Sequence, residues 1–176
     1  RNSYFCCVRK NKMSADPKAP LSFPIALGLA ILPALAASLI GSAATLPNIP
    51  TWYLSLMKPD FTPPNWIFGP VWTILYILMA IACYRVLRKD HVQGYRLPMM
   101  AYLIQAFLNG AWSVGFFAGN SPLLGLIIIV PLWASILWTM VIFWHRDRFA
   151  GSVFLPYLAW VSFASALNFE IWRLNS

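Results

Sequence analysis

The sequence has little charge, and few of its charged residues are acidic. Only 10% of its 176 residues are Asp, Glu, Lys or Arg, and 60% are hydrophobic, whereas soluble domains are about 25% charged. This composition excludes a soluble globular domain. Because one helical membrane span needs about 20 apolar residues, the chain has room for five spans and none for a separate enzyme domain. We therefore predict an all-α integral membrane protein, a bundle of five transmembrane helices.

The residues that catalytic and metal sites need are also scarce. The three cysteines, Cys6, Cys7 and Cys83, form no metal-ligand spacing. No Asp, Glu, Lys, Arg or His lies in the central part of an apolar stretch, which disfavours a proton-coupled pump or a voltage-gated channel. Both histidines, His91 and His145, fall in basic loops. We expect no catalytic residue, no metal site and no required cofactor.

Five apolar stretches are each long enough to cross a bilayer. They cover residues 23–46, 66–87, 97–118, 123–144 and 152–172, within a membrane domain at 21–176. Residues 1–20 are expected to form a disordered basic tail, and the part before Met13 to be an upstream extension or a cloning remnant. The connection at 47–65 is too apolar for a floppy loop and predicts a short interfacial helix followed by an extended, proline-rich approach to the second span.

Basic residues are distributed unevenly over the connections. Eleven fall on the side of the N-terminal tail, and two, Lys58 and Arg173, fall on the other side. The side richer in Lys and Arg stays inside under the positive-inside rule. The N-terminus is thus expected inside, in a bacterial membrane or the mitochondrial outer membrane.

Tryptophan is abundant, with nine residues in the chain. Those near span ends suit an interfacial belt: Trp52, Trp66, Trp144 and Trp172. Others lie deeper in the spans: Trp112, Trp133, Trp138 and Trp160. The deep indoles either line a cavity that stacks a flat apolar ligand or simply pack helices together.

Amides also lie at membrane depth. Gln105 and Asn109 share one face of the third span, and Asn168 lies in the fifth. Such amides are expected to face the bundle interior, where they either join helices or contact a ligand.

The third span carries small residues at four-residue spacing, namely Ala111, Gly115 and Gly119. Because small residues let helices approach closely in lipid, we predict that this face makes a homodimer contact.

Three stretches together resemble a known family. They read WYLSLMKPDFTPPNWIFGPVWTILYILMAIACY, QAFLNGAWSVGFF and PYLAWVSFASALNFEIWRLN, and their order and spacing are similar to those of the translocator protein family, also called tryptophan-rich sensory proteins and, in animals, peripheral-type benzodiazepine receptors. The resemblance covers about residues 24–175. It implies a five-helix bundle, commonly a homodimer, that binds porphyrins, sterols and synthetic aromatic ligands in a pocket closed by the first loop.

The resemblance also implies which residues bind the ligand. The pocket residues that it suggests are Trp66, Asn109, Trp112, Trp160, Ala164, Leu167 and Asn168. The family's sterol-recognition stretch corresponds to Ala164, Leu167, Asn168, Phe169 and Arg173. Here the chain departs from the family, because Phe169 stands where the family motif has Tyr, and the hydroxyl that could meet a sterol is missing.

Two functions follow as hypotheses. The first is a membrane protein that binds porphyrin, either protoporphyrin IX or haem, and other hydrophobic ligands, and acts as sensor, carrier or scavenger. Its partners would be that ligand, membrane lipid and a second copy of the chain, with no nucleic acid. The alternative is a light- and oxygen-dependent enzyme that degrades protoporphyrin, in which Trp66 and Trp160 are oxidised or pass electrons.

Overall fold

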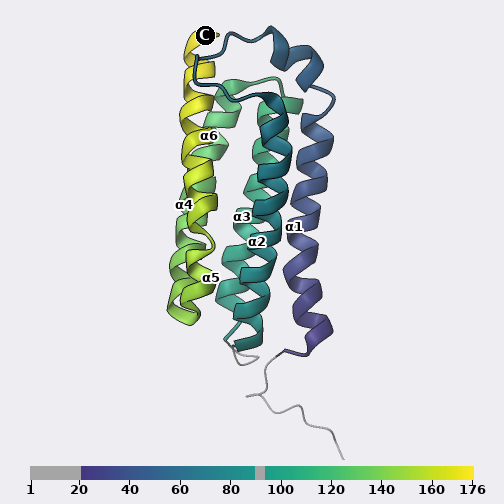
Figure 1. Cartoon of the computed structure of the whole chain (residues 1–176), viewed down its shortest axis with the longest axis vertical. Helices are drawn as coiled ribbons and strands as arrows, with labels where there is room; N and C mark the ends of the chain where they lie inside the picture. The colour runs from purple at the N-terminus through teal and green to yellow at the C-terminus, as the bar shows by residue number, and fades with distance from the viewer. Residues whose placement is uncertain (1–20, 90–93) are drawn as a thin grey trace, which may run out of the picture.

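The computed structural model describes residues 21–89 and 94–176, so the predicted tail, Cys6, Cys7 and His91 lie outside the described residues. Within those two ranges all regular structure is helical, which confirms the all-α class. The long helices lie side by side along one axis (Figure 1). The elements are α1 (Phe23–Thr45), η1 (Ile49–Tyr53), η2 (Asn65–Ile67), α2 (Phe68–Lys89), α3 (Arg96–Ser113), η3 (Val114–Ala118), α4 (Pro122–Arg146), α5 (Arg148–Ser152) and α6 (Leu155–Leu174).

Successive long helices run in opposite directions, so the bundle has two distinct ends (Figure 1). One end, here called the loop end, holds η1, η2, η3 and the last turn of α6. The other end, here called the basic end, holds the end of α2, the start of α3 and the α4–α5 turn. The first connection contains the predicted short helix, as η1, and then the extended proline-rich segment before η2.

Four helices in the described part of the chain are long and apolar enough to cross a membrane. They are 23–45, 65–89, 122–146 and 148–174, the last comprising α5 and α6. The predicted span at 97–118 is divided between α3, of 18 residues, and η3, and it is not among the four. The structure therefore confirms a bundle of apolar helices and leaves the count of five spans unconfirmed.

Small side chains let α1 pack closely on its neighbours. The buried residues of this helix are all Ala or Gly, whereas Leu and Ile cover its outward face. A Cβ on Gly110 of α3 would lie 3.9 Å from the Cα of Ala37. Such close backbone approach is how helices associate where lipid supplies no hydrophobic driving force. The contact is reinforced where the Tyr102 hydroxyl donates to the Ala30 carbonyl at 2.8 Å.

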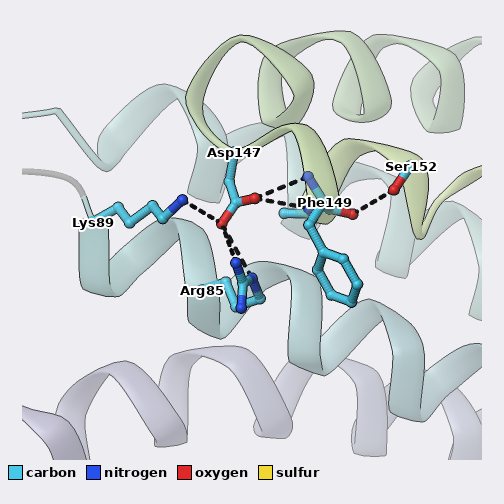
Figure 2. A network of polar contacts seen from close by, with 6 residues as sticks. Arg85, Lys89, Asp147, Phe149 and Ser152 are labelled. Atoms are coloured by element: carbon cyan, nitrogen blue, oxygen red, sulfur yellow. Dashed lines mark hydrogen bonds and ion pairs between the residues drawn. The ribbon is translucent and has the colours of Figure 1, made fainter.

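One buried carboxylate connects three helices at the basic end (Figure 2). Asp147 is 4% exposed, and its Oδ2 lies 3.0 Å from the Arg85 guanidinium and 2.8 Å from the Lys89 ammonium. Its Oδ1 accepts from the backbone N–H groups of Phe149 and Ala150 at the start of α5. Burial alone would raise the pKa of Asp147, but the bonds from Lys89 and Ala150 and the charge of Arg85 outweigh it and lower the pKa to about 2. The end of α2 is thus fixed to the α4–α5 turn.

Candidate functional site

A cavity of about 410 Å³ lies at the loop end of the bundle. Its walls come from α1, η1, the η2–α2 junction, α3, η3 and α6. It is lined by Ser38, Gly41, Ser42, Thr45, Leu46, Ile49, Tyr53, Asn65, Trp66, Phe68, Gly69, Trp72, Thr73, Tyr76, Trp112, Ser113, Phe116, Phe117, Ala164, Leu167, Asn168 and Ile171. We call this cavity the aromatic pocket.

Rings in successive contact form one wall of the aromatic pocket. The ring centroids of Trp72 and Trp112 lie 6.2 Å apart at an interplanar angle of 34°. Trp112 then stacks on Phe116 at 5.8 Å and 26°, and Phe116 contacts Tyr53 of η1 at 6.4 Å. These distances are typical of favourable aromatic pairs. The wall presents large aromatic side chains to whatever occupies the pocket.

A widened turn of helix contributes two neighbouring rings to this wall. In η3 the backbone hydrogen bonds run over five residues, from the Gly119 N–H to the Val114 carbonyl at 2.8 Å and from the Ser121 N–H to the Phe116 carbonyl at 3.2 Å. Such π-helical turns are rare in proteins as a whole, and those that occur often lie at functional sites. Here the turn lets both Phe116 and Phe117 line the pocket.

Asn168 joins three helices beside the pocket. Its Oδ1 accepts from the Trp112 indole N–H at 3.2 Å, and its Nδ2 donates to the Pro122 carbonyl at 2.8 Å. The side chain is 1% exposed. Gly125 of α4 lies so close that an added Cβ would be 2.6 Å from Asn168 Oδ1. The amide therefore fixes the orientation of the Trp112 ring.

Asn109 lies behind the pocket wall and is not one of the lining residues. The Tyr76 hydroxyl donates to its Oδ1 at 2.6 Å, and its Nδ2 donates to the Tyr157 hydroxyl at 2.9 Å. The side chain is 1% exposed, so both ends of this amide are committed inside the protein. Asn109 thus acts on the pocket through Tyr76, which does line it.

The loop end of the pocket is covered by the segment between α1 and α2, which we call the strap (residues 46–64). Asn175, just after α6, holds this strap. Its Oδ1 accepts from the Met57 N–H at 3.0 Å and its Nδ2 donates to the Met57 carbonyl at 2.9 Å. Lys58 lies 4.7 Å above the Tyr53 ring and donates to the Leu56 carbonyl at 3.1 Å. Partial burial lowers the pKa of Lys58.

The structure brings most of the predicted ligand-binding residues together. Trp66, Trp112, Ala164, Leu167 and Asn168 all line the aromatic pocket. Trp66 is 73% exposed and stands at the mouth, whereas the other four are buried.

Trp160, in contrast, does not line the pocket. It packs against Phe68 at 5.7 Å and Phe163 at 5.5 Å. Its Nε1 is buried without a hydrogen-bond partner, which in the described part of the chain is otherwise true only of the two polar side-chain atoms of Gln105. Phe68, which this indole contacts, does line the pocket.

Two residues of the sterol-like stretch, Phe169 and Arg173, lie on the outside of α6, whereas its other three residues are buried and line the pocket. Phe169 is 46% exposed. Among the described residues, the one aromatic ring that it contacts is Trp172, at 5.9 Å. Arg173 pairs with Glu170 at 2.6 Å. Neither residue faces the aromatic pocket.

Part of the predicted dimer face packs against another helix of the same chain. A Cβ on Gly115 would lie 2.7 Å from Ile128 Cδ1 and 3.1 Å from Leu124 Cγ, both on α4 of the same chain. Gly115 is therefore not free to contact a second copy. Ala111 is half-buried and Gly119 exposed, and a dimer through this face stays a prediction.

Several lining residues were not predicted from the sequence, above all Trp72 and Tyr76. They lie four residues apart on one face of α2, and their rings are 5.8 Å apart. Trp72 also follows the predicted Trp66 by six residues. The four-residue spacing of the two aromatic residues is the signal that could have identified them as lining residues. No comparable sequence signal marks Tyr53 or Phe116. The same holds for the α1 residues with hydroxyl groups that line the pocket, Ser38, Ser42 and Thr45.

Comparisons with known proteins add evidence of relationship. Residues 29–173 match the TspO/MBR family. The chain is 42% identical to the "Tryptophan-rich protein TspO" of Archaeoglobus fulgidus over 146 residues, which are 83% of this chain and 94% of that protein. It is 43% identical to the protein of the same name from Chlorobaculum tepidum over 155 residues, 86% and 96% of the two chains. It is 31% identical to the human "Translocator protein" over 152 residues, 85% and 89% of the two chains.

Proposed function

The chain belongs to the TspO/MBR family and is an integral membrane protein, and from this premise we propose that it binds a porphyrin or another flat hydrophobic molecule in the aromatic pocket. Family membership supports a role as a membrane sensor or translocator. The observation that carries the proposal is the wall formed by Trp72, Trp112 and Phe116, in which the two successive ring pairs have interplanar angles of 34° and 26°.

The pocket's size and polarity suit such a ligand. Its volume of about 410 Å³ is within the range of about 300–1,000 Å³ that small-molecule sites occupy. Its polar side chains are hydroxyls and amides, which orient a ligand without adding a buried charge. Lys58 on the strap supplies a positive charge close to Tyr53, where the carboxylates of a porphyrin would stay near water.

We further propose a fifth membrane span made of α3 and η3 together. The two elements run without interruption from Arg96 to Ala118. At about 1.5 Å per residue, this length is sufficient for a hydrocarbon core of about 30 Å. The host membrane is proposed to be bacterial or the mitochondrial outer membrane. The basic end, which carries Arg85, Lys89 and Arg148, is proposed to be the inside end under the positive-inside rule.

A fluorescence titration tests the binding proposal. Protoporphyrin IX added to the protein in lipid nanodiscs in the dark should quench tryptophan emission with saturation at one porphyrin per pocket. Trp72→Phe should remove part of this quenching, whereas Trp138→Phe, which changes a 39% exposed indole outside the pocket, should not. Linear, unsaturable quenching that is the same in both variants would refute binding in this pocket.

The same preparation separates binding from the alternative, degradation of porphyrin. Under light and air, the porphyrin absorbance is followed after saturation. If the protein only binds porphyrin, the absorbance should decay at the same rate as in protein-free nanodiscs. Consumption of many porphyrins per protein molecule would instead establish the enzyme, and the Trp66→Phe variant would then report whether that indole takes part.

A further inference from the structure

A second cavity of about 440 Å³ lies in the groove between α1 and α2. Its outer rim is made of large apolar side chains on the bundle surface, with Leu35 48%, Ile77 54% and Ile81 44% exposed. Its floor is formed by small residues, such as Ala34 of α1 and Ala80 of α2. Since both helices are apolar enough to cross a membrane, this groove faces lipid.

The groove adjoins the aromatic pocket. Ser38, Thr73 and Tyr76 line both cavities. Tyr76 forms the partition between them, and its hydroxyl is bonded to Asn109 at 2.6 Å. Thr73 is exposed, with its hydroxyl bonded to the Gly69 carbonyl of its own helix at 2.9 Å. The seam between α1 and α2 therefore leads from the lipid-facing surface to the pocket wall.

The approach from water passes the strap. The strap covers the loop end of the pocket beside Trp66, and the two bonds between Asn175 and the backbone of Met57 hold the strap to α6. Moving the strap away from α6 requires both bonds to break. No hydrogen bond in the described part of the chain joins α1 to α2 across the groove, so passage on this side requires only that Tyr76 rotate and release its bond to Asn109.

We propose that the ligand of the aromatic pocket enters and leaves laterally, from the bilayer through the groove between α1 and α2, past Tyr76. This inference rests on the proposed function. The occupant of the groove is the same flat hydrophobic molecule in transit, because the groove ends at residues that also line the pocket. A molecule of that kind concentrates in lipid, so the groove connects the pocket with the phase where the ligand is most abundant.

Narrowing the groove tests the proposal. Ala80→Phe places a ring in the groove at a position that is not itself part of the pocket lining. Leu35→Trp enlarges a side chain that is already 48% exposed and so leaves the core unchanged. Each variant is reconstituted in lipid vesicles and mixed with protoporphyrin IX in a stopped-flow instrument. Association is followed as tryptophan quenching, and dissociation as recovery after dilution into protein-free vesicles. Ala166→Phe, on an exposed face of α6 outside both cavities, is the matched control.

Lateral exchange predicts that both rate constants fall by about tenfold in the groove variants, because a taller barrier slows entry and exit equally. The equilibrium affinity and the Ala166→Phe control should match the unmodified protein. Unchanged rates in both groove variants would overturn the proposal, and faster rates in Asn175→Ala would then assign entry to the strap side. Absence of saturable quenching in the unmodified protein would instead refute the proposed function, so the two failures are distinguishable.

Discussion

Replacing Asn109 by Leu tests whether this amide serves the ligand or the fold. The two side chains are similar in size, so the change mainly removes the bonds to Tyr76 and Tyr157. Interhelical hydrogen bonds in membrane proteins are worth about 0.6 kcal/mol on average and at most about 1.7. A buried hydroxyl left without a partner costs a further 1–3 kcal/mol or so. We therefore expect Asn109→Leu to lower the free energy of unfolding by about 2–4 kcal/mol.

The assay is reversible unfolding in mixed detergent micelles with increasing SDS, followed by tryptophan fluorescence. A double-mutant cycle with Tyr157→Phe isolates the pairwise term, which should be about 0.5–1.7 kcal/mol. Gln105→Leu is the matched control, because this amide lies one turn away on α3, is fully buried and has no partner for either polar atom. Its replacement should be neutral or stabilising.

Two results would refute this reasoning. A coupling between Asn109 and Tyr157 that cannot be distinguished from zero would mean that the bond carries no energy. An affinity for protoporphyrin IX that falls further in the Asn109→Leu/Tyr76→Phe double variant than in Tyr76→Phe alone would mean that Asn109 contacts the ligand directly. If Asn109 acts through Tyr76, the double variant binds as the Tyr76→Phe single variant does.

Other features lead to further predictions. Because the folded-state pKa of Asp147, about 2, lies below its unfolded value of about 3.9, its contribution of about 2 kcal/mol is present above pH 4 or so and is lost as the pH falls towards 2. Thermal unfolding of Asp147→Asn should lack this loss, and an equal pH slope in both proteins would assign the effect elsewhere. Ala164→Thr should weaken porphyrin binding by about 1–3 kcal/mol through crowding of the pocket, at nearly constant melting temperature, and unaltered affinity would remove Ala164 from the site. Gly125→Ala should destabilise by about 1–3 kcal/mol in the SDS assay, since its Cβ would lie 2.6 Å from Asn168 Oδ1, whereas Gly28→Ala, with nothing within 4 Å, should not; equal stability of the two would contradict the packing at Gly125.

Apolar stretches and their limits gave the helices to within a few residues, because length, charge and proline decide where a helix can lie in lipid. The predicted start of the first span at Phe23 is the observed start of α1. The sequence could not show that η3 is a π-helical turn, since no residue pattern distinguishes it from the α-helix before it.

The site was less predictable than the helices for a similar reason. A ring's neighbours depend on helix rotation, which is set by packing among all the helices. Trp160 and Asn109 do not line the pocket, whereas Phe68 and Tyr76, which they contact, do line it. The helix that packs on Gly115 also depends on helix rotation, because a small residue allows close approach by any helix. In the structure that helix is α4 of the same chain.

The widened turn at η3 makes the length of the helix, and not only its side chains, a determinant of what the protein can hold. A π-helical turn holds one residue more than an α-helical turn, so deletion of one residue from Val114–Ala118 that restored regular α-helix would leave the α3 residues before the turn and the chain after it in place. Only the side chains of the turn would change their directions, and Phe116 and Phe117 would no longer both line the pocket. A single-codon deletion or insertion at this turn would therefore change both aromatic rings of the pocket wall at once. Substitution of one ring would not have this effect.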